Sequence, residues 1–259
     1  MGRRSMIDTM EIDAIVLAGG SAGGLDDNVP CKGLVPICDR PMVEYVIDAL
    51  RACPSIRRIV AVLPDAGKGE WQRKADQIVI SYGNVVENFL AAVSALPDSE
   101  RVLVMSGDVP LMTAEAVEDY LRTCEPFDAD MYYPISTRES VEARFPGAQR
   151  TYMHIREGTY TGGNIGLVNP AVIVANRDLM ESVFEARKSP LRLVQILGFG
   201  FIVKFVLRRL TMTELEHKVS ELIGGSGRAV VVGHPEIGFD VDKPADLALA
   251  TQLLTGGTC

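Results

Sequence analysis

The sequence predicts an α/β protein, a three-layer sandwich with a Rossmann-like, mainly parallel sheet. Short apolar runs of strand length alternate with segments of helical spacing along most of the chain. The first run, Ile12 to Leu17, leads directly into Gly19-Gly20, which is typical of a buried parallel strand followed by a tight loop. Strands that alternate with helices indicate a parallel sheet covered on both faces. We expect a single domain over residues 1–259, with a loose tail at residues 1–10.

The remaining elements follow the same patterns. Further strands are expected at residues 59–63, 77–81, 101–105, 131–135, 150–158, 165–168, 230–232 and 237–241. Helices are expected at residues 42–52, 85–96, 113–124, 171–187 and from 244 onward, with a helical insertion at 190–225. Asn84 and Thr113 stand at favoured N-cap positions, and Pro244 at a favoured first helical position.

Charge and cysteine content narrow the classes of function. The formal net charge is -8, which argues against a nucleic-acid partner because such a partner needs a basic face. A nucleotide remains compatible with this charge, since backbone amides, a local Lys and Mg²⁺ can hold phosphates. The five cysteines are scattered, and no apolar stretch follows Arg3-Arg4. We therefore expect reduced thiols, no secretory signal and a cytoplasmic location.

A glycine-rich loop follows the first strand, with Gly19, Gly20, Gly23 and Gly24 in it. Because glycine has no Cβ, phosphate oxygens can approach the backbone amides of such a loop. Open α/β sheets bind ligands at the carboxyl ends of their strands, where this loop lies. Lys32 follows and can reach back to a triphosphate. The alternative is that the glycines only turn the chain and that Lys32 is a solvated surface charge.

Four segments taken together resemble the nucleotidyltransferase superfamily. They are Leu17-Ala18-Gly19-Gly20, Lys32-Gly33-Leu34-Val35-Pro36 with Arg40-Pro41-Met42-Val43, Ser106-Gly107-Asp108-Val109-Pro110-Leu111, and Asp240-Val241-Asp242-Lys243-Pro244-Ala245-Asp246-Leu247. Their order and spacing fit over nearly the whole chain. The chain looks like a MobA-like NTP transferase, similar to the molybdenum-cofactor and cobinamide-phosphate guanylyltransferases. The segment from Arg150 to Asn164 looks closer still to an uncharacterised bacterial subgroup.

The resemblance implies a nucleotide-diphospho-sugar transferase type of fold and a role for each matching residue. The nucleotide-binding residues it implies are Leu17, Ala18, Gly19, Gly20, Ser21, Lys32, Gly83, Asn88, Ser106 and Gly107. Lys32 and Asp108 are implied as catalytic, and Asp108 and Asp242 as the ligands of Mg²⁺. The competing interpretation makes Asp108 a turn carboxylate and Asp242 an N-cap before Pro244.

The loop departs from the family pattern at one position. Relatives usually carry Gly-x-Gly-x-Arg-Met after Ala-Gly-Gly, whereas residues 21–29 contain no Arg and include Asp26 and Asp27. We therefore expect Lys32 and the backbone amides of residues 19–23 to hold the triphosphate. Gly162, Gly163 and Asn164 are expected on the acceptor side of the cleft, because glycine permits close approach and the Asn amide can bind a hydroxyl or phosphate. A plain hairpin turn is the alternative there.

These residues predict a Mg²⁺-dependent nucleotidyltransferase. It would transfer the NMP moiety of an NTP to a small phosphorylated acceptor and release pyrophosphate. One alternative is a GT-A glycosyltransferase that uses an NDP-sugar, although that class carries its Asp-x-Asp at a mid-chain strand end. The other alternative is a catalytically silent nucleotide-binding regulator, which the missing Arg makes plausible.

The segment 191–210 is intensely apolar, is interrupted by Gly198 and Gly200, and contains Lys204, Arg208 and Arg209. It is too short and too interrupted for a spanning helix. A buried helical pair is the favoured interpretation. The alternatives are a homodimer surface, an apolar pocket for the acceptor and, with less support, contact with a membrane surface.

Overall fold

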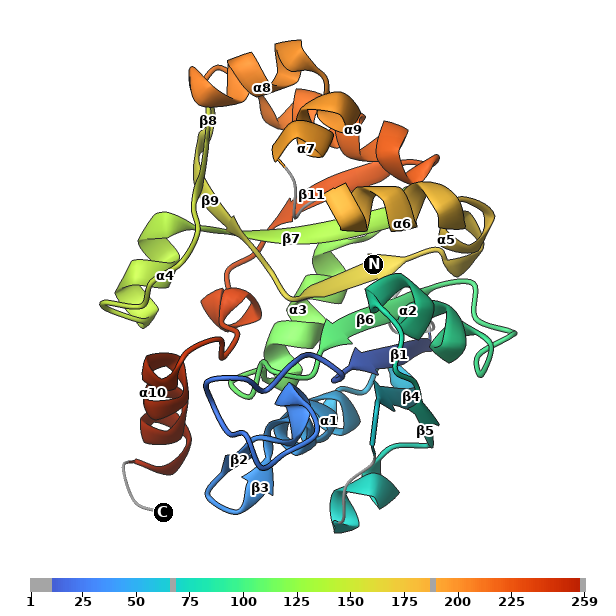
Figure 1. The fold of residues 1–259 in the computed structure, drawn as a ribbon, viewed down its shortest axis with the longest axis vertical. Coiled ribbons are helices and arrows are strands. Elements are labelled where there is room, and N and C mark those ends of the chain that lie inside the picture. Colours follow the sequence, from blue (N-terminus) through green and yellow to red (C-terminus); the bar gives the residue numbers. More distant parts are fainter. Residues whose placement is uncertain (1–10, 66–68, 187–189, 257–259) are drawn as a thin grey trace, which may run out of the picture.

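The computed structural model in Figure 1 describes residues 11–65, 69–186 and 190–256. The tail expected at residues 1–10 lies outside the described residues. The central sheet has the strand order β5-β4-β1-β6-β10-β7-β9-β8, and β11 pairs with β7. Its strands are β1 (Ile12–Leu17), β4 (Ile56–Leu63), β5 (Gln77–Ile80), β6 (Val102–Ser106), β7 (Met131–Thr137), β8 (Met153–Ile155), β9 (Gly158–Gly162), β10 (Ile165–Val168) and β11 (Gly227–Val231).

Pairing directions make the sheet mixed but mostly parallel. Strands β5, β4, β1 and β6 run parallel to one another, and β11 runs parallel to β7. Strand β10 is antiparallel to both of its neighbours, β6 and β7, and β8 and β9 form an antiparallel hairpin beside β7. The prediction of a Rossmann-like, mainly parallel sheet is confirmed. A small separate ladder joins β2 (Pro36–Ile37) to β3 (Arg40–Pro41).

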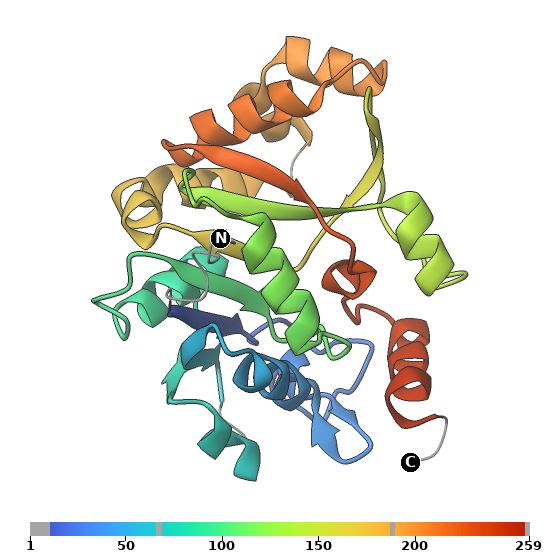
Figure 2. The same ribbon diagram turned by 180° about the vertical axis from the view of Figure 1, so that it is seen from behind.

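Helices cover both faces of this sheet, as the opposite views of Figures 1 and 2 show. The helices are α1 (Met42–Ala52), α2 (Val85–Val93), α3 (Ala114–Thr123), α4 (Arg138–Arg144), α5 (Pro170–Ala175), α6 (Arg177–Ala186), α7 (Pro190–Leu197), α8 (Phe199–Val206), α9 (Met212–Ile223) and α10 (Pro244–Thr255). Helices α1 and α3 bury their apolar residues on one face of β1, and α2 and α5 pack on the other. The three-layer arrangement is therefore the predicted one.

Local sequence explains where these helices lie. Val43, Val46, Ile47 and Leu50 recur at helical spacing on α1, and all are fully buried. Burial of each such side chain contributes about 1.5–3 kcal/mol as an upper estimate. The expected starts are also confirmed: Asn84 forms a capping box at α2, Thr113 caps α3, and Pro244 opens α10.

Several expectations about local structure are wrong. Residues 237–241 form no strand; a short 3-10 helix at Pro235–Gly238 precedes an extended stretch that continues to the next helix. The single helix expected at 171–187 is two helices within the described residues, because Asn176 leaves the helical conformation. Helix α4 was not expected at all. Cys31, Cys53 and Cys124 are free buried thiols, but Cys38 takes part in a disulfide, so the expectation of reduced cysteines fails at that position.

The apolar segment is also less covered than expected. Helix α8 has no buried residue, and Phe199 and Val206 are 75% and 70% exposed. The interpretation of this segment as a buried helical pair is therefore wrong for α8. Among the described residues, no helix is long and apolar enough to cross a membrane.

A buried carboxylate fixes the amino end of the central strands. Asp13 on β1 has no exposed side-chain surface, and both Arg57 and Arg58 donate two hydrogen bonds to it at 2.6–3.1 Å. Ser99 donates a further hydrogen bond. Burial alone would raise the pKa of Asp13, but these hydrogen bonds outweigh it and hold the pKa far below its ordinary value. The carboxylate is therefore a structural anion at the edge opposite the glycine loop.

We expect Asp13→Asn to lower the free energy of unfolding by about 3 kcal/mol, because it leaves two arginines without their buried anion. The loss lies at the low end of the usual range, since Arg57 and Arg58 are 39% and 33% exposed and can turn to water. Because the folded-state pKa is lowered, this stabilisation is fully present above the unfolded pKa of about 4 and is lost progressively as pH falls from there toward the much lower folded-state pKa. Urea unfolding from about pH 3 to about pH 8 measures the difference.

The matched control is Asp98→Asn, which removes an exposed carboxylate from the same end of the sheet. We expect it to change stability by less than about 0.5 kcal/mol. Equal effects of the two substitutions at neutral pH would contradict the structural role assigned to Asp13.

Candidate active site

The glycine loop folds back so that residues from its two ends touch. The Lys32 amide donates to the Gly20 carbonyl at 2.6 Å, and the Gly33 amide donates to the Ala18 carbonyl at 3.2 Å. Ala18 itself is nearly enclosed by two glycines: a Cβ on Gly33 or on Gly107 would lie 2.6 or 2.5 Å from the Ala18 Cβ. Glycine at these two positions therefore lets Lys32 and Asp108 approach the end of β1.

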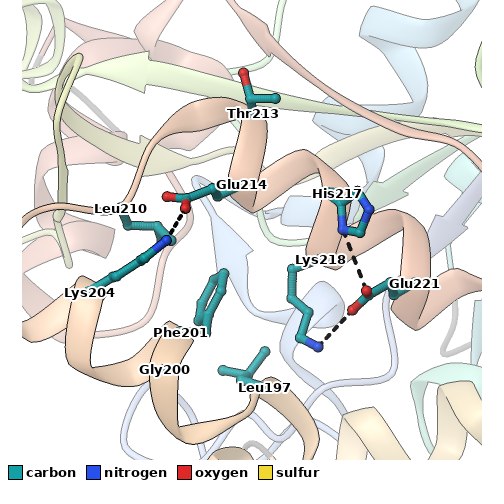
Figure 3. Close-up of a pocket in the computed structure, with 10 residues that line it drawn as sticks. All are labelled: Leu197, Gly200, Phe201, Lys204, Leu210, Thr213, Glu214, His217, Lys218 and Glu221. Carbon is teal, nitrogen blue, oxygen red and sulfur yellow. Dashed lines mark hydrogen bonds and ion pairs between the residues drawn. The ribbon is translucent and has the colours of Figure 1, made fainter.

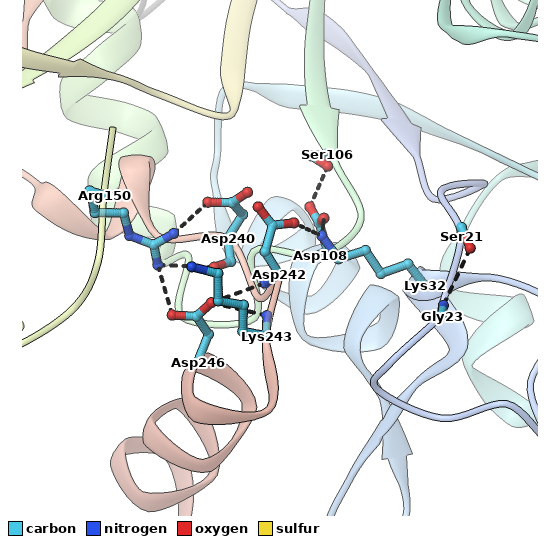
Figure 4. A network of polar contacts seen from close by, with 10 residues as sticks. All are labelled: Ser21, Gly23, Lys32, Ser106, Asp108, Arg150, Asp240, Asp242, Lys243 and Asp246. Atoms are coloured by element: carbon cyan, nitrogen blue, oxygen red, sulfur yellow. Dashed lines mark hydrogen bonds and ion pairs between the residues drawn. The ribbon is translucent and has the colours of Figure 1, made fainter. Parts of the chain in front are cut away.

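Lys32 lies between two of the predicted site carboxylates, as Figure 4 shows. Its ammonium is 2.5 Å from Asp108 Oδ2 and also contacts Asp242 Oδ1. The Lys32 and Asp108 side chains are only 12% and 13% exposed, whereas Asp242 is 57% exposed. Burial alone would lower the pKa of Lys32, but the neighbouring carboxylates, Asp108 first, raise it above its ordinary value. Lys32 is therefore a firmly charged cation.

A third carboxylate completes an acidic cluster. Asp108, Asp240 and Asp242 each offer an oxygen, and these oxygens lie within 4.8 Å of one another. Burial and then the charge of Asp242 raise the pKa of Asp240 to about 6, against the opposing effect of Arg150. Burial also acts to raise the pKa of Asp242, but the hydrogen bond from Lys32 outweighs it and lowers that pKa. Because like charges this close repel, the cluster is suited to a cation.

The backbone holds the two halves of the cluster together. The Val241 amide donates to the Asp108 carbonyl at 3.0 Å, which fixes the segment before α10 against the end of β6. At the start of α10, the Asp246 carboxylate accepts from the Lys243 amide at 3.1 Å. Ser106 donates to Asp108 from the end of β6. The alternatives that treat Asp108 and Asp242 as separate turn and capping carboxylates do not account for their shared contact with Lys32.

Arg150 was not among the predicted site residues. Its guanidinium is 6% exposed, donates to Asp240 Oδ1 at 2.8 Å and to the Asp240 carbonyl at 2.9 Å, and stacks on the Phe239 ring at 4.4 Å. The sequence placed it at the start of the strand expected at 150–158 and gave no sign of its partner. Asp240 was visible in the Asp-x-Asp motif, but only Asp242 was assigned a role.

Gly83 precedes α2 and Asn88 lies on it, and both are beside the glycine loop. The Asn88 side chain is 7% exposed and accepts a hydrogen bond from Ser81 Oγ at 2.6 Å. A Cβ on Gly19 would lie 3.5 Å from Asn88 Nδ2, and one on Gly83 would lie 3.3 Å from Asn88 Oδ1. The fold thus gathers these residues with the loop. Leu17 ends β1 beside Ser106, whereas Ser21 is exposed and its Oγ accepts from the Gly23 amide at 3.3 Å.

Gly162, Gly163 and Asn164 do not form a hairpin turn. Gly162 ends β9, and β9 and β10 both pair antiparallel with β7, so Gly163 and Asn164 interrupt what is otherwise one long strand. The Asn164 carbonyl accepts from the Ser106 amide at 2.9 Å, which places this interruption beside the end of β6. A Cβ on Gly163 would lie 2.7 Å from Ile237 Cγ2, so packing alone already requires glycine there.

The fold and the site define the class of protein. Parallel strands that end in a glycine loop, a buried Lys and facing carboxylates are the frame of the nucleotidyltransferase superfamily, and the comparisons agree. Residues 14–196 match the model of the MobA-like NTP transferase domain. The chain belongs to that family.

Two individual proteins are similar to this chain in sequence. A solved structure of a hypothetical transferase from Thermus thermophilus is 39% identical, with 92% of this chain and 100% of that chain covered and a TM-score of 0.81. The bifunctional protein GlmU of Stenotrophomonas maltophilia is 32% identical over 126 residues, which are 44% of this chain but 26% of that protein. The chain thus spans about a quarter of the length of that curated relative.

A third match concerns the fold alone. The structure of 4-diphosphocytidyl-2C-methyl-D-erythritol synthase from Anaerococcus prevotii has a TM-score of 0.58 at 14% identity, with 95% of this chain and 98% of that chain covered. At this identity the match supports the sandwich architecture and carries no residue roles.

Proposed function

We propose that this protein transfers the NMP moiety of an NTP to a small phosphorylated acceptor and releases pyrophosphate. The observation that carries the proposal is the contact of the buried Lys32 ammonium with both Asp108 and Asp242, at the mouth of the glycine loop. Nucleotidyl transfer needs phosphates held in line and the spreading negative charge neutralised. A cation and two metal-binding carboxylates at one strand edge meet both needs.

The phosphates of the NTP bind at the loop in this proposal. The amides of residues 19–23 face the phosphate oxygens, and Lys32 turns from the carboxylates to the phosphates. Lys32 can do so because its four-carbon stem is flexible and its charge is a point charge. Asp26 does not interfere, because its Oδ1 accepts from the Asn28 amide and side chain, both at 2.9 Å, and Asp27 is exposed. Gly83 and Asn88 lie where the base is expected.

The acidic cluster fits a magnesium ion. Mg²⁺ prefers oxygen ligands and is usually held by one or two carboxylates together with substrate phosphates. Asp108 and Asp242 are the proposed ligands, and Asp240 lies within reach of both. When bound, the ion polarises the α-phosphate and neutralises the charge that develops there. Arg150 holds Asp240 in place by two hydrogen bonds and keeps that edge of the cluster rigid.

The acceptor approaches from the side of Gly162, Gly163 and Asn164. An oxygen of the acceptor phosphate attacks the α-phosphorus, a new phosphoanhydride bond forms, and the bond to the β-phosphate oxygen breaks. Pyrophosphate leaves with that electron pair. Lys32 stabilises the charge on the phosphate oxygens during this step, and no covalent intermediate with the protein is needed.

A panel of the four common NTPs and a set of NDP-sugars, each with Mg²⁺ or with EDTA, tests the proposal by thermal shift. At about one hundred times Kd, a ligand stabilises the folded state by about 2.7 kcal/mol, which raises Tm by roughly 5–10 °C for a chain of this size. We expect one or more NTPs to produce such a shift with Mg²⁺ and a much smaller one with EDTA. Pyrophosphate release with a panel of sugar phosphates and other monophosphates then measures turnover.

Two other outcomes would overturn the proposal. A larger shift with an NDP-sugar than with any NTP, without pyrophosphate release, would favour the glycosyltransferase. Tight NTP binding without turnover across the acceptor panel would favour the silent regulator.

A further inference from the structure

Two cavities, each of about 470 Å³, lie against the helices α8 and α9. Figure 3 shows the first, a groove lined by Leu197 and Phe201 from below and closed by the ion pairs Lys204–Glu214 and Lys218–Glu221. Its charged groups neutralise one another, and none of its lining residues belongs to the acidic cluster.

The second cavity has strands on one side and helices on the other. Ile135, Met153 and Tyr160 line it from the sheet, and Phe205 of α8 and Val219 of α9 line it from the opposite wall. Apolar and aromatic side chains predominate, as in small-molecule pockets, which are commonly about 300–1,000 Å³. The helices expected as an insertion at 190–225 thus supply one wall of a cavity on the main sheet.

One end of this cavity lies beside the acidic cluster. Tyr133 and Gly162 both line the cavity, and a Cβ on Gly162 would lie 2.2 Å from the Tyr133 hydroxyl. Arg150, which donates to Asp240 Oδ1 at 2.8 Å, directly precedes the lining residues Thr151 and Tyr152, so one segment joins the cavity to the acidic cluster. Gly162 is exposed and Tyr133 is 41% exposed, so this end is open to solvent.

We propose that this cavity binds an apolar, ring-sized group of the acceptor. The acceptor is therefore a water-soluble monophosphate of an aromatic or short branched alcohol. The inference rests on the proposed function, because it takes the acceptor phosphate to lie at the acidic cluster. The alcohol part extends past Gly162 and Tyr133 into the cavity. Three tyrosines and a phenylalanine in the wall favour flat or branched groups, which stack on such rings. At this entrance the Tyr133 hydroxyl lies directly over Gly162, which has no side chain of its own.

The direct test compares the binding of 1-naphthyl phosphate and methyl phosphate in the presence of Mg²⁺. The two probes carry the same phosphate and differ in the apolar group. Burial of about 60 Å² of apolar surface corresponds to roughly tenfold in affinity. We therefore expect the wild-type protein to prefer the naphthyl probe by about tenfold or more. Naphthyl fluorescence and calorimetry both report this ratio.

A substitution that fills the cavity, compared with a control substitution outside it, tests whether the preference for the naphthyl probe arises in this cavity. Ala229 lines the cavity from β11, and Val231 follows two residues later on the same strand, is 52% exposed and lies outside the cavity lining. We expect Ala229→Trp to abolish the naphthyl preference and Val231→Trp to retain it. If Ala229→Trp unfolds, Phe205→Ser is the second variant, because Phe205 is 40% exposed and its loss is tolerated more easily.

The outcomes separate this inference from the proposed function. Loss of the preference in the wall variants, with unchanged NTP-induced thermal shifts, supports an apolar acceptor site. Absence of the preference in the wild type, or its persistence in both wall variants, overturns the inference even if NTPs bind and pyrophosphate is released. A failure of NTP binding in the wild type would instead overturn the proposed function.

Discussion

Asp108→Asn is expected to lower Mg²⁺-dependent turnover by about 10²–10³-fold or more, the usual effect of removing one group that stabilises transition-state charge. Asp108 is 13% exposed and contacts Lys32, and its oxygen lies within the acidic cluster. Asparagine keeps the size of the side chain but cannot carry the charge that holds a divalent cation. Pyrophosphate release at saturating NTP measures the loss.

The fold should survive this substitution. Lys32 loses its ion pair with Asp108 but keeps its contact with Asp242, so it is not left without an anion. Removal of one charge also relieves repulsion among the three carboxylates, and the amide oxygen can still accept from Ser106. We expect the free energy of unfolding to change by less than about 1 kcal/mol. Asp98→Asn, with the same chemical change at the opposite end of the sheet, should keep full turnover. Unaltered Mg²⁺-dependent activity in Asp108→Asn would remove Asp108 from the mechanism.

Lys32→Met is expected to weaken NTP binding by roughly 10- to 150-fold, because a charged hydrogen bond contributes about 1.5–3 kcal/mol. The loop contains no Arg to compensate for the lost ammonium. The remaining affinity should depend strongly on Mg²⁺, since only the ion and the backbone amides then neutralise the triphosphate. Titration calorimetry with the preferred NTP, with Mg²⁺ or EDTA, measures both effects.

Lys243→Met is the matched control for Lys32→Met. Lys243 follows Asp242 directly, is exposed and has its ammonium 3.2 Å from Gln149 Oε1. Its loss removes the same charge from the same neighbourhood without removing a contact to Asp108 or Asp242, so we expect NTP affinity to change by less than about threefold. Tight NTP binding in EDTA that Lys32→Met leaves unchanged would show that the phosphates bind elsewhere.

Much of the secondary structure could be predicted from the sequence because it depends on interactions between residues that are close together in the chain. The structure satisfies several local preferences of the sequence. Apolar runs of strand length form strands, Asn84 and Thr113 cap helices, and residues 42–52 with their helical spacing form α1. The stretch 237–241 was wrongly predicted to be a strand because its apolar residues are buried although its backbone pairs with no strand. Ile237, Phe239 and Val241 are fully buried in a segment that forms no ladder. The spacing of apolar residues indicates which side chains are buried, but it does not indicate which backbone segments pair with one another.

The sequence by itself determined the family, the α/β sandwich and the strand-end positions of Gly19 and Asp108, because the carboxyl ends of parallel strands share one edge of a sheet. Only the tertiary structure decided that Arg150 holds Asp240, that α8 is exposed and that an apolar cavity adjoins the acidic cluster. These features join segments far apart in the chain. Whether a charge is paired, or an apolar face covered, depends on what the rest of the fold places against it.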